Sequence, residues 1–258
     1  MAFHYPSPIR ILLFGALFPL AALTTHAAPP QRQPVLVELF TSEGCSDCPP
    51  ADDLLARLDR EQFVAGAEAI VLSEHVTYWN HQGWSDPFSS DLMDKRQQQY
   101  ARTLALGTLY TPQIVVDGTE QFVGSDAMKL QSALEREAAK SKLDLGIENA
   151  QIDTKGAVIF SVHLPPGTTG MLVAAVAQDA TVSRVSRGEN AGRTLHHVAV
   201  VRALKEYNAT SAALAHALTL PGPVQLSNRS SGMSDRLVVF LVDSNGKVLG
   251  AAEKTLHP

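Results

Sequence analysis

The sequence predicts an α/β protein whose second half is rich in strands. Three observations support this prediction. Between residues 34 and 145, apolar strand-like runs alternate with segments of helical periodicity. Between residues 146 and 258, short apolar runs recur with turn residues between them, which is typical of an antiparallel sandwich or sheet. A C-x-x-C motif also stands directly between the first apolar run and the first helical segment.

The first half carries the order of elements found in thioredoxins. We expect, in order, a strand at 35–40, a helix at 49–58, a strand at 69–73, a helix at 91–106, a hairpin through 117–118 and a helix at 125–142. Pro49 and Pro50 suit the first turn of a helix, where a missing N–H costs nothing. Asp117-Gly118 is a turn pair that favours a hairpin.

The second half has a different pattern, in which short apolar runs predict mostly strands. Strands are expected at 158–164, 171–178, 197–204, 224–226, 237–242 and 247–252. Residues 205–218 have a partly helical pattern. The sequence therefore predicts a thioredoxin-like domain at 34–145 and a β-rich, sandwich-like domain at 146–258.

Cys45 and Cys48 are the only cysteines in the chain. The same spacing begins some zinc sites, but the chain has no second C-x-x-C to complete a four-thiolate site. A disulfide that closes so short a loop stabilises by only about 2 kcal/mol in the chain-entropy model, so chemistry is favoured over an inert local disulfide. In a strand–C-x-x-C–helix unit, Cys45 lies exposed at the helix N-terminus as the nucleophile. Cys48 is then the resolving thiol.

Thr111-Pro112 stands immediately before the strand expected at 113–116. In thioredoxin-like proteins a cis-proline occupies this place and packs beside the C-x-x-C, where its neighbouring backbone can pair with a bound peptide. We therefore predict that Pro112 is cis and belongs to the catalytic site, with Thr111 beside it as a substrate-binding residue. An ordinary trans proline at the first position of a strand is the alternative.

Four further side chains are candidates for the site. His75 follows the second strand, at the same end of a parallel sheet as the C-x-x-C. It could stabilise the Cys45 thiolate, shuttle a proton or complete a metal site, or it could simply be hydrogen-bonded in a loop. Trp79 and Trp84 could line a substrate groove or pack in the core. Arg193 lies in a glycine-containing loop and could bind a substrate carboxylate.

The N-terminal segment predicts export. Residues 1–27 show a weakly basic start, an apolar run and small residues before the expected cleavage point, which is the pattern of a secretory signal. The mature chain is expected to be periplasmic or secreted, without membrane attachment after cleavage. The formal net charge of the full chain, -5, and its lack of a Lys/Arg cluster argue against nucleic acid as a partner.

Five segments together resemble a known family. They are 38–52, 75–80, 83–88, 110–113 and 188–195, and they span nearly the whole mature chain. Their pattern is similar to that of a family of exported bacterial thioredoxin-like proteins, catalogued as a domain of unknown function and numbered 1223. The resemblance implies a thioredoxin-like fold with a β-rich C-terminal part. It supplies no substrate.

The sequence therefore predicts an exported thiol–disulfide oxidoreductase that acts through Cys45 and Cys48, with Pro112 and His75 in the catalytic set. Its substrate would be a protein or small-molecule thiol or disulfide, and a redox partner protein would serve it. No cofactor and no bound metal are expected. Two alternatives stay open: a periplasmic copper- or zinc-binding protein that uses the cysteines with His75, and a non-catalytic binding module with a structural disulfide.

Overall fold

The computed structural model describes residues 1–4, 32–209, 218–220 and 234–256. The predicted signal peptide, residues 1–27, lies outside the described residues except for its first four. The strand expected at 224–226 lies outside them as well. Within the described ranges, no helix combines the length and the apolar content that crossing a membrane requires.

The described elements follow the predicted alternation in the first half. They are, in chain order, β1 (Gln33–Thr41), α1 (Pro49–Glu61), β2 (Ala67–His75), α2 (Asp91–Thr103), β3 (Gln113–Val116), β4 (Glu120–Val123), α3 (Ala127–Ala138), β5 (Gly146–Ile152), β6 (Val158–His163), β7 (Met171–Arg184), β8 (Thr194–Asn208), β9 (Leu218–Leu220), β10 (Asp235–Val242) and β11 (Val248–Leu256).

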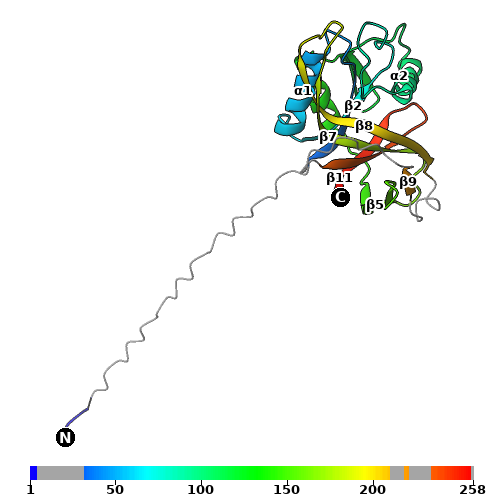
Figure 1. Ribbon diagram of the computed structural model, residues 1–258. Coiled ribbons are helices and arrows are strands. Elements are labelled where there is room, and N and C mark those ends of the chain that lie inside the picture. The colour runs from blue at the N-terminus through cyan, green and yellow to red at the C-terminus, as the bar shows by residue number, and fades with distance from the viewer. Residues whose placement is uncertain (5–31, 210–217, 221–233, 257–258) are drawn as a thin grey trace. The chain divides into compact units, whose positions relative to one another are not determined.

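Most of the strands form one mixed sheet with the order β11-β10-β7-β8-β2-β1-β3-β4 (Figure 1). β2 is parallel to β1 and to β8, whereas the other neighbours are antiparallel. A second sheet has the order β5-β6-β9. The fold is therefore mixed α/β, as the sequence predicts.

The large sheet continues past residue 145, where the sequence predicts a domain boundary. β7 and β8 are 14 and 15 residues long, and β8 lies directly beside β2. The predicted partly helical segment at 205–218 is wrong for residues 205–208, which extend β8. Strand pairing with β7 overrides the weak helical pattern there.

Helices cover the two faces of the first half of the sheet. Ile114 and Val116 of β3 pack in the cluster that contains the apolar side chains of α1 and α3. Val115, between them, packs with Tyr100 of α2. Because successive residues of a strand point to opposite faces, α2 lies across the sheet from α1 and α3. Figure 1 shows α1 and α2 on the two sides of the strands.

The strand register brings three chain segments to one end of the sheet. Thr41 at the end of β1 pairs with His75 at the end of β2, and Phe40 pairs with Gln113 at the start of β3. The C-x-x-C that follows β1, the loop that follows β2 and the proline that precedes β3 therefore meet at this end. This is the arrangement on which the predicted site depends.

Candidate functional site

Cys45 and Cys48 form a disulfide, with their Cα atoms 5.4 Å apart. Cys48 is the N-cap of α1, and its carbonyl accepts hydrogen bonds from the amides of Ala51 and Asp52 at 2.8 and 3.1 Å. Pro49 and Pro50 occupy the first positions of the helix, as expected. The resolving cysteine therefore caps the helix, and Cys45 stands one turn before it.

The Thr111–Pro112 peptide bond is cis, which confirms the sequence prediction. Pro112 lies close to α1, because a Cβ added to Gly124 would meet Pro112 Cβ at 3.1 Å and Ala51 Cβ at 2.9 Å. Trp79 connects this loop to the C-x-x-C. Its indole N–H donates to Thr111 Oγ1 at 2.7 Å, and its Cβ would lie 3.0 Å from a Cβ added to Gly44. Pro112, Thr111 and Trp79 thus surround the disulfide turn.

His75 is in the right part of the fold but does not contact the cysteines in the described chain. Its Nδ1 lies 2.7 Å from Asp86 Oδ2, and its ring packs against His197 with a centroid distance of 4.6 Å. His75 Nε2 is buried without a hydrogen-bond partner. Asp86 therefore holds the imidazole, and a role of His75 toward the Cys45 thiolate stays a prediction.

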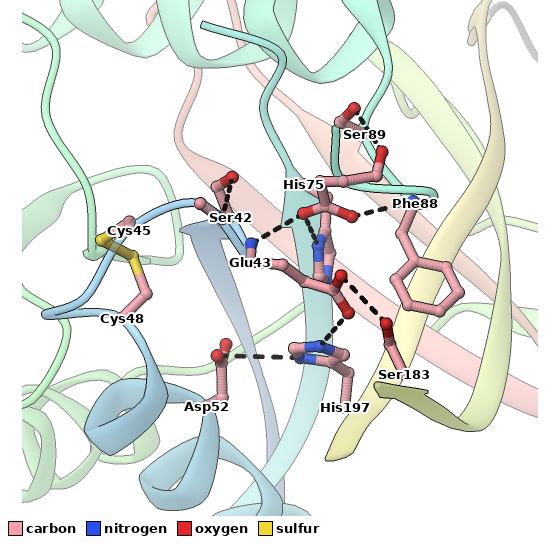
Figure 2. A network of polar contacts seen from close by, with 12 residues as sticks. Ser42, Glu43, Cys45, Cys48, Asp52, His75, Phe88, Ser89, Ser183 and His197 are labelled. Atoms are coloured by element: carbon pink, nitrogen blue, oxygen red, sulfur yellow. Dashed lines mark hydrogen bonds and ion pairs between the residues drawn. A yellow bond between two sulfur atoms is a disulfide. The ribbon is translucent and has the colours of Figure 1, made fainter. Parts of the chain in front are cut away.

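Five buried ionisable side chains lie beside the disulfide, and we call them the imidazole cluster. They are Glu43, Asp52, His75, Asp86 and His197. His197 lies between two carboxylates: its Nε2 is 3.2 Å from Glu43 Oε1, and its Nδ1 is 3.7 Å from Asp52 Oδ2. In Figure 2 the Asp52 side chain projects from α1 toward His197. The cluster joins α1, the C-x-x-C turn, β2 and β8.

The imidazole cluster shifts two pKa values in opposite directions. Burial lowers the pKa of His197, but the adjacent Asp52 and Glu43 outweigh burial and raise it from 6.5 to about 10. Burial raises the pKa of Asp86, but His75 and the amides of Glu43 and Phe88 lower it below its usual value. At neutral pH, His197 is therefore an imidazolium and Asp86 a carboxylate.

Glu43 is the hub of polar contacts in the cluster. Its amide donates to Asp86 Oδ2 at 2.8 Å. Its carboxylate accepts from Trp84 Nε1 at 2.7 Å. It also accepts from Ser183 Oγ at 3.1 Å (Figure 2). Trp84 therefore fixes the carboxylate that holds His197. Because Glu43 stands two residues before Cys45, the cluster is tied to the disulfide through the backbone.

The cover loop, residues 185–193 between β7 and β8, lies over the disulfide turn. Asn190 Nδ2 donates to the carbonyls of Glu43 and Cys45, each at 2.9 Å, and Glu189 Oε2 accepts from the Ser46 amide at 3.1 Å. Cys45 is only 1% exposed and Cys48 is 0% exposed. The prediction of an exposed Cys45 is wrong, because a loop from far along the chain covers it.

Arg193 lies at the end of the cover loop, with its side chain exposed. Its Nη1 donates to Asn190 Oδ1 at 2.9 Å, so it orients the amide that contacts the disulfide turn. Arg193 also lines a hollow of about 100 Å³ against the first turn of α1; its other lining residues are Pro49, Asp52, Asp53, Thr194, Leu195 and His196. Arg193 is therefore beside the site.

The cysteines and His75 do not assemble as metal ligands. Across the described ranges, no group of three or more His, Cys, Asp or Glu side chains is placed to hold a metal ion. The polar partner of His75 is Asp86, and the two sulfur atoms are bonded to each other.

Sequence reasoning did not identify several residues of the site: Glu43, Asp52, Asp86, Ser183, Asn190 and His197. One signal was available for Asp52. It stands four residues after Cys48, on the helix side that carries Ala51 and Leu55, and a carboxylate on an apolar side needs a buried partner. For Asn190 and His197 the sequence holds no local signal, since their partners are about 150 residues away.

The comparisons with known proteins agree on the fold. One similar solved structure is Protein AGR_C_4864 from Agrobacterium tumefaciens, with a TM-score of 0.60 and 21% identity over 88% of this chain and 95% of that one. Another is HBP35 of Porphyromonas gingivalis, with a TM-score of 0.59 and 14% identity over 88% of this chain and 76% of that one. At these identities the likeness concerns the fold alone.

A search among curated proteins finds no match to this sequence. The family model described as Protein of unknown function (DUF1223) matches residues 36–242. That range runs from β1 to the end of β10 and contains the disulfide, the cis-proline, the imidazole cluster and the cover loop. The chain belongs to the DUF1223 family.

Proposed function

We propose that this protein is an exported thiol–disulfide oxidoreductase in which the Cys45–Cys48 pair cycles between a disulfide and two thiols. The observation that carries the proposal is the disulfide at the start of α1, packed beside a cis-proline at the same end of the sheet. Helix N-termini stabilise thiolates, and a stabilised thiolate can take part in thiol–disulfide exchange.

The proposal includes a thioredoxin-like arrangement for the first half of the chain. β1, α1 and β2 form a parallel β-α-β unit, and the cysteines lie in the turn between β1 and α1. The cis-proline directly precedes β3, which is followed by β4 and α3. The mixed α/β sheet and the similar solved structures are consistent with it. The proposed location, periplasmic or secreted, is supported by the signal-like pattern of residues 1–27.

The proposed reaction starts from the two thiols. The Cys45 thiolate attacks a substrate disulfide, whose S–S bond breaks to give a mixed disulfide and one substrate thiolate, which takes up a proton. Cys48 loses its proton and attacks the Cys45 sulfur, which releases the second substrate thiolate. Two electrons pass from the protein to the substrate, and the protein ends with the Cys45–Cys48 disulfide that the structure contains. A redox partner with a dithiol reverses these steps.

The imidazole cluster is suited to accept the proton that Cys48 releases. Asp52 is one helical turn after Cys48 and therefore lies on the same side of α1. Its Oδ1 is buried and has no hydrogen-bond partner, and its Oδ2 faces the imidazolium of His197. Because Oδ2 is held by His197 and Oδ1 has no partner, Oδ1 can take up a proton without a movement of the side chain.

A non-catalytic binding module is the second candidate, and one observation favours it. Both cysteines are almost completely buried, as is typical of a structural disulfide. Under this proposal the pair stays oxidised, and the β-rich half recruits a partner.

The redox equilibrium of the pair separates the two proposals. The full mature protein would be equilibrated with glutathione at graded ratios, and the thiols would be alkylated and counted by mass spectrometry. Cycling oxidoreductases have midpoints of about -270 to -120 mV, whereas a structural disulfide remains oxidised below about -300 mV. Cys48→Ser should trap a mixed disulfide with a peptide disulfide substrate, and Cys45→Ser should not.

A further inference from the structure

Access to the disulfide depends on the cover loop. It occludes the C-x-x-C turn through contacts that come from a different part of the chain. Asn190 is itself only 1% exposed, and its two hydrogen bonds go to backbone carbonyls on either side of Gly44. Glu189 adds a third contact, to the Ser46 amide. Neither cysteine is open to solvent, so a thiol that attacks the disulfide needs a local opening, and these three contacts hold the cover loop closed on the turn.

The internal structure of the cover loop favours movement as one piece. Two backbone bonds close its neck, from Val185 N to Arg193 O at 3.0 Å and from Gly192 N to Val185 O at 2.8 Å. The tip between them is held to the rest of the molecule by Asn190, by Glu189 and by the packing of Gly188 against Trp84. Breaking a few contacts at the tip would therefore uncover the disulfide without melting β7 or β8.

Among the residues at the tip of the cover loop, Asn190 makes the most side-chain hydrogen bonds. Its amide group donates both of its N–H bonds to buried carbonyls, and Arg193 fixes its oxygen at 2.9 Å. An amide held on three sides has one orientation, and an apolar replacement would leave two carbonyls buried without a donor. The same contact also fixes the position of the Cys45 backbone.

We propose that Asn190 is a positioning residue that latches the cover loop over the Cys45–Cys48 disulfide, so that the loop gates access of a thiol or disulfide substrate to the sulfur atoms. The role of the gate in admitting a substrate rests on the proposed function. The gate itself concerns the reactivity of a disulfide that is present in either case. Substrate binding opens the gate by replacing the Asn190 contacts with its own backbone.

The rate of disulfide reduction by dithiothreitol tests the gate in the folded, full mature protein. Asn190→Ala should be reduced about tenfold faster than the unchanged protein, because it loses two buried hydrogen bonds that only the closed loop makes. Arg187→Ala is the matched control. It lies on the same loop, is exposed and makes no hydrogen bond or ion pair with any described residue, so its rate should be unchanged.

A second control separates local opening from a general loss of stability. Arg236 of β10 pairs with Asp59 near the end of α1 and with Asp179 of β7, neither of which belongs to the cover loop. Arg236→Ala should lower the midpoint of urea unfolding without raising the reduction rate under native conditions. If it raises that rate as much as Asn190→Ala does, or if Asn190→Ala reacts no faster than the unchanged protein, the gate is disproved.

The gate and the proposed function fail in different ways. A faster Asn190→Ala combined with a midpoint below about -300 mV keeps the gate and rejects the oxidoreductase. A cycling midpoint combined with an unchanged Asn190→Ala rate keeps the oxidoreductase and rejects the gate. If Asn190→Ala folds poorly, Glu189→Ala replaces it, since it removes the contact to Ser46 at the exposed edge. Its reduction rate should rise by a smaller factor, and an unchanged rate would reject the gate.

Discussion

Two of the buried charged clusters in the described part of the chain balance their charges differently. The imidazole cluster balances carboxylates against histidines beside the disulfide. The second, which we call the guanidinium cluster, is built from Glu38, Glu74, Arg96 and Tyr100. There Arg96 Nε lies 2.7 Å from Glu38 Oε1, and its Nη2 donates to Tyr100 Oη at 2.7 Å.

The difference is whether the positive charge can be lost. Arginine keeps its charge at any pH a protein survives, so the positive charge of the guanidinium cluster is fixed. Burial, and next the charge of Glu38, raise the pKa of Glu74 well above its usual value, which favours its neutral form. In the imidazole cluster the balancing charge is an imidazolium, which loses its proton near pH 10. The changeable cluster is the one beside the cysteines.

The largest expected effect is the loss of the fixed charge. Arg96→Met should lower the free energy of unfolding by about 3–5 kcal/mol, because the buried Glu38 would lose its charged partner. Urea unfolding at pH 7 measures this. Arg136→Ala, which removes an exposed ion pair with Glu120, is the control of the same residue type and should leave the midpoint unchanged. Equal midpoints for the two variants would contradict a stabilising role for the buried guanidinium.

The imidazole cluster should make stability depend on pH. The pKa of His197 is about 10 in the folded protein and 6.5 without its partners, so its stabilisation is complete below pH 6.5 and is lost as pH rises through 10. At pH 6, His197→Gln should cost at most about 5 kcal/mol, the value of the whole pKa difference. Urea unfolding at pH 6, 8 and 10 should show the two proteins converging as pH rises. A constant difference would disprove the role of the imidazolium.

Sequence reasoning succeeded where the determining contacts are local. The helix start at Pro49-Pro50, the hairpin through Asp117-Gly118 and the cis bond before Pro112 depend on neighbouring residues, and all three are present. The sequence does not predict β5, because its residues are largely polar and show no apolar alternation. It forms a strand by pairing with β6. Patterns of apolar residues cannot identify a strand in which no residue is fully buried.

The burial of the site could not be predicted for a different reason. Cys45 was expected to be exposed because a C-x-x-C turn by itself is open at its outer face. The covering residue, Asn190, is 145 positions away, and its amide pairs with backbone carbonyls rather than with any side chain. A hydrogen bond to a backbone carbonyl does not require a particular residue type at the partner position. The sequence therefore shows no complementary residue that would reveal the contact. The same holds for His197, whose two carboxylates lie in different elements.

A smaller effect is expected from the disulfide itself. Replacing both Cys45 and Cys48 with alanine should cost about 2 kcal/mol or less, because the closed loop is very short. This is below the expected cost of losing the charge of Arg96 or His197, so the disulfide would be a minor source of stability. Urea unfolding of the oxidised protein and of the variant at pH 7 measures the difference. A cost above about 4 kcal/mol would favour the structural role of the disulfide.

The smallest effect should come from Glu74→Gln in the guanidinium cluster. If Glu74 is already neutral, an amide of the same shape should cost less than about 1 kcal/mol at pH 7. Glu43→Gln is the matched change in the imidazole cluster and should cost more, because it removes a charge that holds His197 protonated. Urea unfolding of both variants compares the clusters directly. If Glu74→Gln were the costlier change, Glu74 would be ionised and Arg96 would have to balance two carboxylates. The guanidinium cluster would then carry the unbalanced charge, and the contrast between the clusters would be reversed.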